Sequence, residues 1–428
     1  MSETHKFSTL AIHAGQQSDP TTGACATPIY QTASYEFESP EQAAALFNLQ
    51  EFGNIYSRLT NPTVSVLENR VTALEGGAAA LAVASGHAAQ LITFHTLMEP
   101  GDEILASTKL YGGSITQLSQ SFKKFGWGAN FVDPDPAKMK AAIKPNTKAI
   151  FIESLANPGG VVTDIAAIAD VAHEAGIVLV VDNTLATPFL CRPIEHGADI
   201  VVHSLTKFLG GQGNSIGGII VDSGNFDWMK SGKYSTLSEP SASYHGMVFG
   251  DVFGDAMGNI AFAIACRAVG LRDLGPALAP MNAFLILNGI ETLPLRMQRH
   301  ADNALEVAKF LKNHDMVEWV SYAGLEDDPY HGLQQKYMPK GAGAVMTFGV
   351  KGGYEAGKKV VGAVRLFKHL ANIGDTRSLI IHPSSTTHRQ LGEAEQIKAG
   401  AGPDVIRLSV GIEDVEDIKA DLDQALRS

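Results

Sequence analysis

The chain has 428 residues, of which 45% are hydrophobic and 18% charged, so it is long enough for about two or three globular domains. A formal net charge of −12 without a basic cluster argues against nucleic acid and anionic membrane surfaces as partners. Because it has no apolar signal segment, no apolar run near the ~20 residues of a spanning helix and only three scattered cysteines, we expect a cytoplasmic protein with reduced thiols.

The N-terminal part predicts an irregular arm followed by a sharply bounded helix. Residues 1–60 have weak periodicity and scattered prolines. In the next segment, TNPTVSVLENRVTALEGG, Asn61 is placed to cap a helix, Pro62 takes its first position, and Gly76 and Gly77 end it.

Short apolar runs then alternate with amphipathic helical stretches from about residue 78 to 221. Most of these runs are continuously apolar, as in strands that are covered by helices on both faces. The pattern predicts a doubly wound α/β sheet of about seven mostly parallel strands. The strand candidates are ALAVAS, DEILAS, ANFVD, KAIFIES, IVLVVD, DIVVHS and GGIIVD.

The remaining chain predicts an insertion and a second domain. Residues 222–275 show no clear period, and a long helical stretch after them is interrupted near Pro294. The rest mixes strand-like GAVMTFGV, SLIIHP and DVIRLSVG with helix-like GKKVVGAVRLFKHL and DVEDIKADLDQALR, which is typical of an α+β domain. We therefore predict an arm over 1–60, a large α/β domain over 61–293 and a smaller α+β domain over 294–428.

Three polar features follow strands at the edge of the sheet where ligands bind in open α/β folds. The segment Ser85-Gly86-His87 leads into a helix whose first amides suit an anion such as phosphate, Asp182 ends IVLVVD, and Lys207 follows Ser204 and Thr206. Each has an ordinary explanation by itself: a strand-to-helix turn, a capping carboxylate, a solvated lysine.

Together the three features predict one cofactor, pyridoxal 5′-phosphate (PLP). PLP requires a phosphate site, an acid beside its pyridine nitrogen and an amine that forms a Schiff base. Lys207 would supply the amine, Asp182 the acid, and the hydroxyls of Ser204 and Thr206 would face the phosphate. None of the 14 histidines shows metal-ligand spacing, so we predict no metal.

These motifs also carry a family resemblance over nearly the whole chain. It resembles the Cys/Met-metabolism (transsulfuration) family of PLP enzymes, whose members have fold type I, a PLP-binding α/β sheet with a smaller C-terminal α+β domain. The matching motifs, in the family's order, are AIHAGQ, YSRLTNPT, LEGG, ASGHAA, YGG, VVDNT, HSLTKFLGG, GIETLPLRM, HPSSTTH and RLSVGIE.

The resemblance implies cofactor-binding roles for the residues already selected. Lys207 corresponds to the Schiff-base lysine that moves protons between substrate carbons, and Asp182 to the partner of the pyridine nitrogen. The amides of Gly86 and His87, with Ser204 and Thr206, correspond to phosphate ligands. Relatives usually carry Met at the position of His87, but the implied contact is through the backbone.

It also implies roles for residues that lie elsewhere in the chain. Tyr111 of YGG corresponds to the tyrosine that stacks on the ring and assists proton transfer, although a half-buried core aromatic is the alternative. Asn157 corresponds to a residue near the cofactor's 3′-oxygen. Arg407 corresponds to the arginine that binds the substrate α-carboxylate, and Asn372 to a residue near that carboxylate.

Tyr56 and Arg58 correspond to residues that reach the phosphate in a neighbouring subunit, whereas without the family a solvated surface arginine would be favoured. This implies a homo-oligomer, a dimer of dimers with shared active sites. Its small-molecule partners would be an amino-acid substrate and a thiol or sulfide.

Within the family, the sequence is most similar to the branch that carries out γ-replacement on O-acetyl-L-homoserine with sulfide or a small thiol. The insertion containing FDW and YHGMVFG favours this branch, and Gly113 stands where methionine γ-lyases carry Cys. Cystathionine γ-synthase, O-succinylhomoserine sulfhydrylase and methionine γ-lyase activities remain alternatives, because one scaffold supports all of them.

Two alternatives from other classes are less favoured. No G-x-G-x-x-G follows the first sheet strand, which argues against a nicotinamide-binding Rossmann enzyme. A catalytically inactive interaction protein with this fold would not need the full set of catalytic residues that the sequence retains.

Overall fold

The computed structural model describes residues 5–428 apart from 388, 390–391, 393–395 and 398–399. Its centre is a seven-stranded sheet with the strand order β1-β7-β6-β5-β4-β2-β3. All neighbouring strands are parallel except that β7 runs antiparallel to both β1 and β6. The strands are β1 (Ala79–Val83), β2 (Glu103–Ser107), β3 (Gly128–Val132), β4 (Thr147–Glu153), β5 (Val178–Asp182), β6 (Ile200–Ser204) and β7 (Gly218–Asp222).

Helices cover both faces of this sheet, which explains why most of its strands are continuously apolar, whereas the edge strand β3 is half-buried along its length. On β5, Leu179 and Val181 belong to one buried cluster, while Val178 and Val180 belong to another on the opposite face. The first cluster includes residues of α3 (Pro62–Glu75), α7 (Ile165–Glu174) and α14 (Pro280–Glu291). The second includes α4 (Gly86–Leu97) and the segment after β7, which folds as short helices such as α11 (Phe249–Val252) and α12 (Ala261–Ala265).

The ends of α3 confirm the prediction from its sequence. The Asn61 side chain accepts hydrogen bonds from the backbone amides of Thr63 and Val64. At the other end Gly76 adopts a left-handed conformation with φ 76°, which a residue with a side chain adopts at a cost.

A second sheet of five strands lies in the C-terminal part, with the order β10-β11-β12-β9-β8. It is packed with α15, which is separated from α14 by the single residue Thr292, close to the interruption expected at Pro294. Its elements are α15 (Leu293–Lys312), β8 (Val317–Ser321), α16 (His331–Tyr337), β9 (Val345–Val350), α17 (Gly353–Ala363), β10 (Lys368–His369), β11 (Leu379–Ile381), β12 (Val405–Ser409) and α19 (Val415–Leu426).

One predicted helix of this part was wrong in its extent. The pattern GKKVVGAVRLFKHL predicted a helix over 357–370, but α17 ends at Ala363 and Lys368–His369 form strand β10. The Asp421 carboxylate of α19 accepts hydrogen bonds from the backbone amides of residues 365–367. These amides are therefore satisfied by a distant carboxylate instead of by another helical turn.

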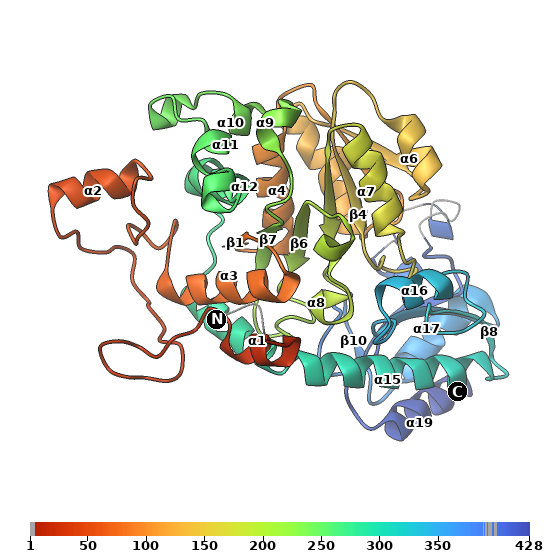
Figure 1. Cartoon of the computed structure of the whole chain (residues 1–428). Helices are drawn as coiled ribbons and strands as arrows, with labels where there is room; N and C mark the ends of the chain where they lie inside the picture. The colour runs from red at the N-terminus through yellow and green to blue at the C-terminus, as the bar shows by residue number, and fades with distance from the viewer. Residues whose placement is uncertain (1–4, 388, 390–391, 393–395, 398–399) are drawn as a thin grey trace.

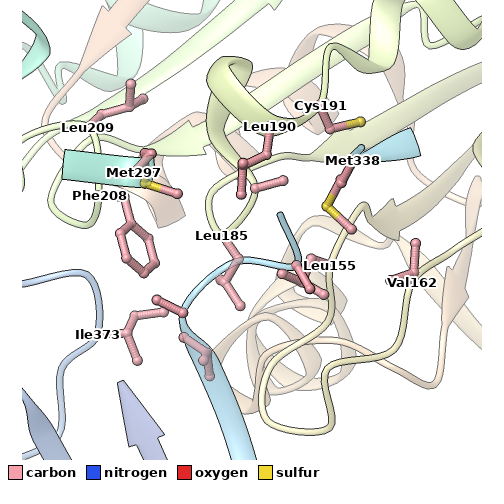
Figure 2. Close-up of a cluster of buried hydrophobic side chains, with 14 of the residues drawn as sticks. Leu155, Val162, Leu185, Leu190, Cys191, Phe208, Leu209, Met297, Met338 and Ile373 are labelled. Atoms are coloured by element: carbon pink, nitrogen blue, oxygen red, sulfur yellow. The ribbon is translucent and has the colours of Figure 1, made fainter. Parts of the chain in front are cut away.

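The two sheets share one buried core, part of which is drawn in Figure 2. Leu155 and Leu185 follow β4 and β5, and Phe208 follows β6, so they come from the loops at the carboxyl ends of the large sheet. They lie in the same cluster as Met297 of α15 and Ile373 of the C-terminal part (Figure 2). This contact fixes the C-terminal part over the edge of the sheet where ligands are expected.

The segment before α3 extends away from the rest of the chain (Figure 1). Its beginning, α1 (Phe7–His13), packs against α3, α14 and α15, whereas α2 (Pro40–Phe47) lies far out on the arm. Apolar side chains on the arm are exposed, among them Phe47 and Phe52. Among the helices in the described ranges, we find none that combines the length and the apolar character needed to span a membrane.

Candidate active site

A cavity of about 250 Å³ opens at the carboxyl ends of the central strands, under the C-terminal part. Its volume is close to the lower end of the range for small-ligand sites, about 300 Å³. It brings together all the site residues predicted from the sequence except Tyr56 and Arg58. The predicted residues in its lining are Gly86, His87, Tyr111, Asn157, Asp182, Ser204, Thr206, Lys207, Asn372 and Arg407.

Lys207 projects into this cavity from the turn after β6. Its Nζ donates a hydrogen bond to Oδ1 of Asn372, at 2.5 Å. Burial, assisted by the positive charge of Arg407, lowers the pKa of Lys207 to about 8. Roughly a tenth of the amine is therefore unprotonated at pH 7 and about half at pH 8, and the unprotonated amine is the form that acts as a nucleophile or a proton acceptor.

Asp182 ends β5 on the floor of the cavity. Its Oδ1 accepts a hydrogen bond from the Thr184 amide at 3.0 Å, and Nε2 of Gln90 lies 3.4 Å from Oδ2. Burial raises the pKa of Asp182, while the hydrogen bonds from Thr184 and the charge of His203 lower it. A buried carboxylate in this position favours a ligand with a positively charged N–H group, such as a protonated pyridine ring.

The start of α4 provides an anion cradle. The Ser85 hydroxyl caps the helix by accepting the Ala88 amide, so the amides of Gly86 and His87 stay available at the end of the helix dipole. A Cβ on Gly86 would lie 2.8 Å from Cβ of Ser204, so only glycine lets these two elements approach. Oγ1 of Thr206 accepts the Gly217 amide at 3.1 Å, which fixes this hydroxyl beside the cradle.

Arg407 of β12 reaches the cavity from the second sheet. Its guanidinium contacts Oδ1 of Asn157 at 3.4 Å and the carbonyl of Asn372 at 3.1 Å. Burial lowers its pKa to about 10, and its Nε, although buried, has no hydrogen-bond partner within the described residues. The unsatisfied donor indicates an anionic ligand, and a carboxylate matches the fork of an arginine.

Tyr111 lies at the open side of the cavity, immediately before α5 (Gly112–Thr116). Its side chain is 49% exposed, which argues against the alternative of a core aromatic. Its ring centroid lies 6.0 Å from that of His87. A Cβ on Gly113 would come within 2.4 Å of the Tyr111 ring, so glycine at this position is what lets the ring lie there.

Sequence reasoning missed several polar residues in the lining, among them Glu153 and Gln90. Glu153 ends β4 beside Asp182, and its carboxylate accepts the amides of Tyr111 at 2.6 Å and Asn157 at 3.1 Å. Burial and the negative charge of Asp182 both raise its pKa well above the ordinary value. Asp182 was identified because it is a carboxylate at the end of an apolar run. Glu153 follows the apolar run in KAIFIES, so the same signal could have identified it. Gln90, one turn into α4, carried no such signal.

The structure does not bring Tyr56 and Arg58 into the cavity. Both lie before α3, and neither lines the cavity of their own chain. The Arg58 guanidinium donates to the carbonyl of Arg272 and lies 5.6 Å from the Tyr56 ring. Their predicted role in a neighbouring subunit therefore stays a prediction.

The donor set fits PLP, because an anion cradle, a buried carboxylate and a lysine with a lowered pKa line one cavity. A comparison with protein families agrees: residues 8–427 match the family described as Cys/Met metabolism PLP-dependent enzyme.

Individual relatives are similar over their whole length. The chain is 52% identical to the O-acetyl-L-homoserine sulfhydrylase of Leptospira meyeri, over 100% of this chain and 98% of the relative. It is 49% identical to the homocysteine synthase of Schizosaccharomyces pombe, over 99% of both chains. A crystal structure from Campylobacter jejuni, provisionally named O-acetylhomoserine (thiol)-lyase, superposes with a TM-score of 0.95 at 43% identity, covering 99% of this chain and 100% of that one. That structure carries an N′-pyridoxyl-lysine-5′-monophosphate residue.

Proposed function

The chain belongs to the Cys/Met metabolism PLP-dependent enzyme family, and from this premise we propose that it catalyses γ-replacement on O-acetyl-L-homoserine. Sulfide or a small thiol replaces the acetoxy group on Cγ, which gives homocysteine or methionine and acetate. The observation that carries the proposal is the placement of Lys207, Asp182 and Arg407 around one cavity, in a chain about half identical to sulfhydrylases of this substrate.

We assign a separate role in binding or catalysis to each group of residues around the cavity. When bound, PLP supplies an electron sink joined to the substrate's amino group, which makes protons on the neighbouring carbons removable. Asp182 holds the ring nitrogen, and the amides at the start of α4 with Ser204 and Thr206 hold the phosphate. Arg407 holds the substrate carboxylate and thereby aligns the carbon chain with Lys207.

Lys207 is placed to move the protons of the reaction. With a pKa of about 8, its amine can accept a proton and return it near neutral pH. Its hydrogen bond to Asn372 sets the direction of Nζ in the cavity. Over the whole reaction the bond from Cγ to the acetate oxygen breaks and a bond from Cγ to sulfur forms, and the proton of the entering thiol balances the leaving carboxylate.

Product analysis with three different substrates distinguishes this activity from the related activities that the same scaffold supports. The purified protein with PLP is incubated with O-acetylhomoserine and sulfide, with O-succinylhomoserine and cysteine, and with methionine alone. We expect homocysteine from the first mixture as the dominant product. Dominant release of 2-oxobutyrate from methionine would instead indicate a lyase.

We further propose a homo-oligomer, a dimer of dimers, in which the arm of one chain completes the site of another. Two observations support it. The arm extends from the body with Phe47 and Phe52 exposed, and Tyr56 and Arg58 lie on it, away from their own cavity. Localisation in the cytoplasm stays a prediction from the composition.

A further inference from the structure

Three residues that do not line the cofactor pocket lie together behind the sheet, although two of them come from motifs that supply pocket residues. They are Glu75 of LEGG, Asn183 of VVDNT and His203 of HSLTK, and each is fully buried. Nε2 of His203 lies 2.6 Å from Oε1 of Glu75, and Nδ2 of Asn183 donates to the same oxygen at 2.9 Å. We refer to these three residues as the Glu75 cluster.

The cluster is connected to the cofactor pocket through the chain itself. Asn183 directly follows Asp182, and His203 directly precedes Ser204. Because successive side chains of a strand point to opposite faces, the pocket residues and the cluster residues lie back to back at the ends of β5 and β6. The Asn183 amide donates to the carbonyl of Val202 at 3.0 Å, so the two strand ends are also joined by their backbones.

The cluster also carries charge close to Asp182. Within the described residues, Oε2 of Glu75 and Nδ1 of His203 are buried without hydrogen-bond partners. A buried carboxylate without a partner is costly, and the contacts with His203 and Asn183 offset this cost for Glu75. The titratable groups that act on Asp182 are then His203 from β6, whose positive charge favours the carboxylate, and Glu153 from β4, whose negative charge opposes it.

We propose that the Glu75 cluster is a positioning device for the cofactor: the shared oxygen of Glu75 holds Asn183 and His203, and with them the ends of β5 and β6 that present Asp182 and Ser204 to the pocket. The inference rests on the proposed role of Asp182 as partner of the ring nitrogen. Asp182 touches the cofactor, and the cluster acts through Asp182.

If the cluster had a purely structural role, its variants would change the free energy of unfolding and leave the Kd for PLP unaltered. The test therefore measures both quantities. The variants are His203→Gln and Glu75→Gln in the full-length chain, and PLP is titrated into the apoprotein between about pH 6 and 9. His203→Gln removes the charge that favours the Asp182 carboxylate, and Glu75→Gln removes the carboxylate that holds His203 and Asn183. We expect the Kd for PLP to rise about tenfold, as when supporting partners of a bound ligand group are removed.

The pH dependence gives a readout that loss of packing would not change. Without the His203 charge, which lowers the pKa of Asp182, this carboxylate is protonated at a higher pH, so affinity for PLP is lost at a higher pH than in the native protein as the solution is acidified. Because both variants break the same unit, the double variant should behave like either single variant.

The matched control is His173→Gln. His173 pairs with Asp199 at 3.0 Å, a histidine–carboxylate pair at the opposite end of the same strands. We expect this change to lower the free energy of unfolding while the Kd for PLP and its pH profile stay as in the native protein. If the cluster variants behave in the same way, with altered stability and unaltered affinity, the inference is overturned.

Two further outcomes are informative. If both cluster variants fail to fold, Asn183→Ala is measured instead, because it keeps the Glu75–His203 pair, and an unchanged Kd would contradict the positioning role. If the native protein does not bind PLP at all, the proposed function itself fails, which differs from a PLP-binding protein whose variants bind normally.

Discussion

Lys207 shows how burial changes the chemistry of one residue. A solvated lysine is protonated at neutral pH, but this amine lies in a cavity beside Arg407, and its pKa falls to about 8. We predict that covalent attachment of PLP to the apoprotein accelerates about tenfold per pH unit below pH 8 and levels off above it, because only the neutral amine reacts. Absorbance after mixing with PLP at several pH values measures this.

The control for this measurement is Lys207→Ala. This variant should stay colourless and give no adduct after borohydride reduction, as read by mass spectrometry. A reduced adduct on another side chain would contradict the assignment of Lys207.

Arg407 provides a second prediction at the same scale. Replacement by Lys keeps the charge but loses the planar fork and the unsatisfied Nε. We expect kcat/KM for O-acetylhomoserine to fall about 10- to 100-fold, corresponding to the ~1.5–3 kcal/mol of a charged hydrogen bond. Steady-state kinetics measures the loss, while the Kd for PLP should stay unchanged. An equal loss of PLP affinity would place Arg407 on the cofactor.

The sequence identified residues whose local pattern already signals chemistry, and it missed those that act through the fold. Asp182 and Lys207 stand out because each follows an apolar strand. Gln90 reaches Asp182 only because α4 packs across β6 and β7 beside β5, and no spacing in the sequence reports that contact. Whether Tyr56 and Arg58 belong to a site depends on a second chain, which no pattern within one chain can show.

At the scale of elements, the strands were predictable where both faces are buried. Each of the seven candidates of the large sheet became a strand, because continuous apolar runs bounded by turns have few other solutions. Strand β8 was not predicted, since it is an edge strand with exposed Glu318 and Trp319. The end of α17 was misjudged because its cause, Asp421, lies more than fifty residues further along the chain.

This last contact leads to a prediction about stability. Asp421 is buried and accepts three backbone amides, so Asp421→Ala leaves these donors unsatisfied. We expect the free energy of unfolding to fall by about 2–4 kcal/mol, with kcat unchanged because the site is remote. Urea unfolding followed by circular dichroism measures the change. The control Asp417→Ala, on an exposed position of α19, should cost less than about 1 kcal/mol.

At the scale of the whole molecule, the cavity exists because two sheets share one core. The loops after β4, β5 and β6 pack against α15 and Ile373 (Figure 2), and this contact brings Asn372 and Arg407 over the carboxyl ends of the large sheet. Neither sheet alone contains the set of residues that the proposed reaction needs. The arm, in contrast, contributes nothing to its own cavity.

Arg58 on the arm offers the test of shared sites. Within its own chain its guanidinium contacts the carbonyl of the half-buried Arg272 and the exposed ring of Tyr56, so Arg58→Ala should leave the free energy of unfolding nearly unchanged. If Arg58 binds the phosphate in a neighbouring chain, the variant should retain PLP about tenfold more weakly and have little activity. Unchanged retention would contradict this role.

Mixing two inactive variants makes the test decisive. Arg58→Ala chains keep Lys207, and Lys207→Ala chains keep Arg58, so a mixed oligomer contains some sites with both residues intact. If the site-sharing unit is a pair of chains, random exchange restores about one site in four, because half of the pairs are mixed and each mixed pair has one intact site. Activity is assayed after the two variants are unfolded and refolded together, with each variant refolded alone as the control. A mixture that forms oligomers but stays inactive would show that each chain builds its site alone.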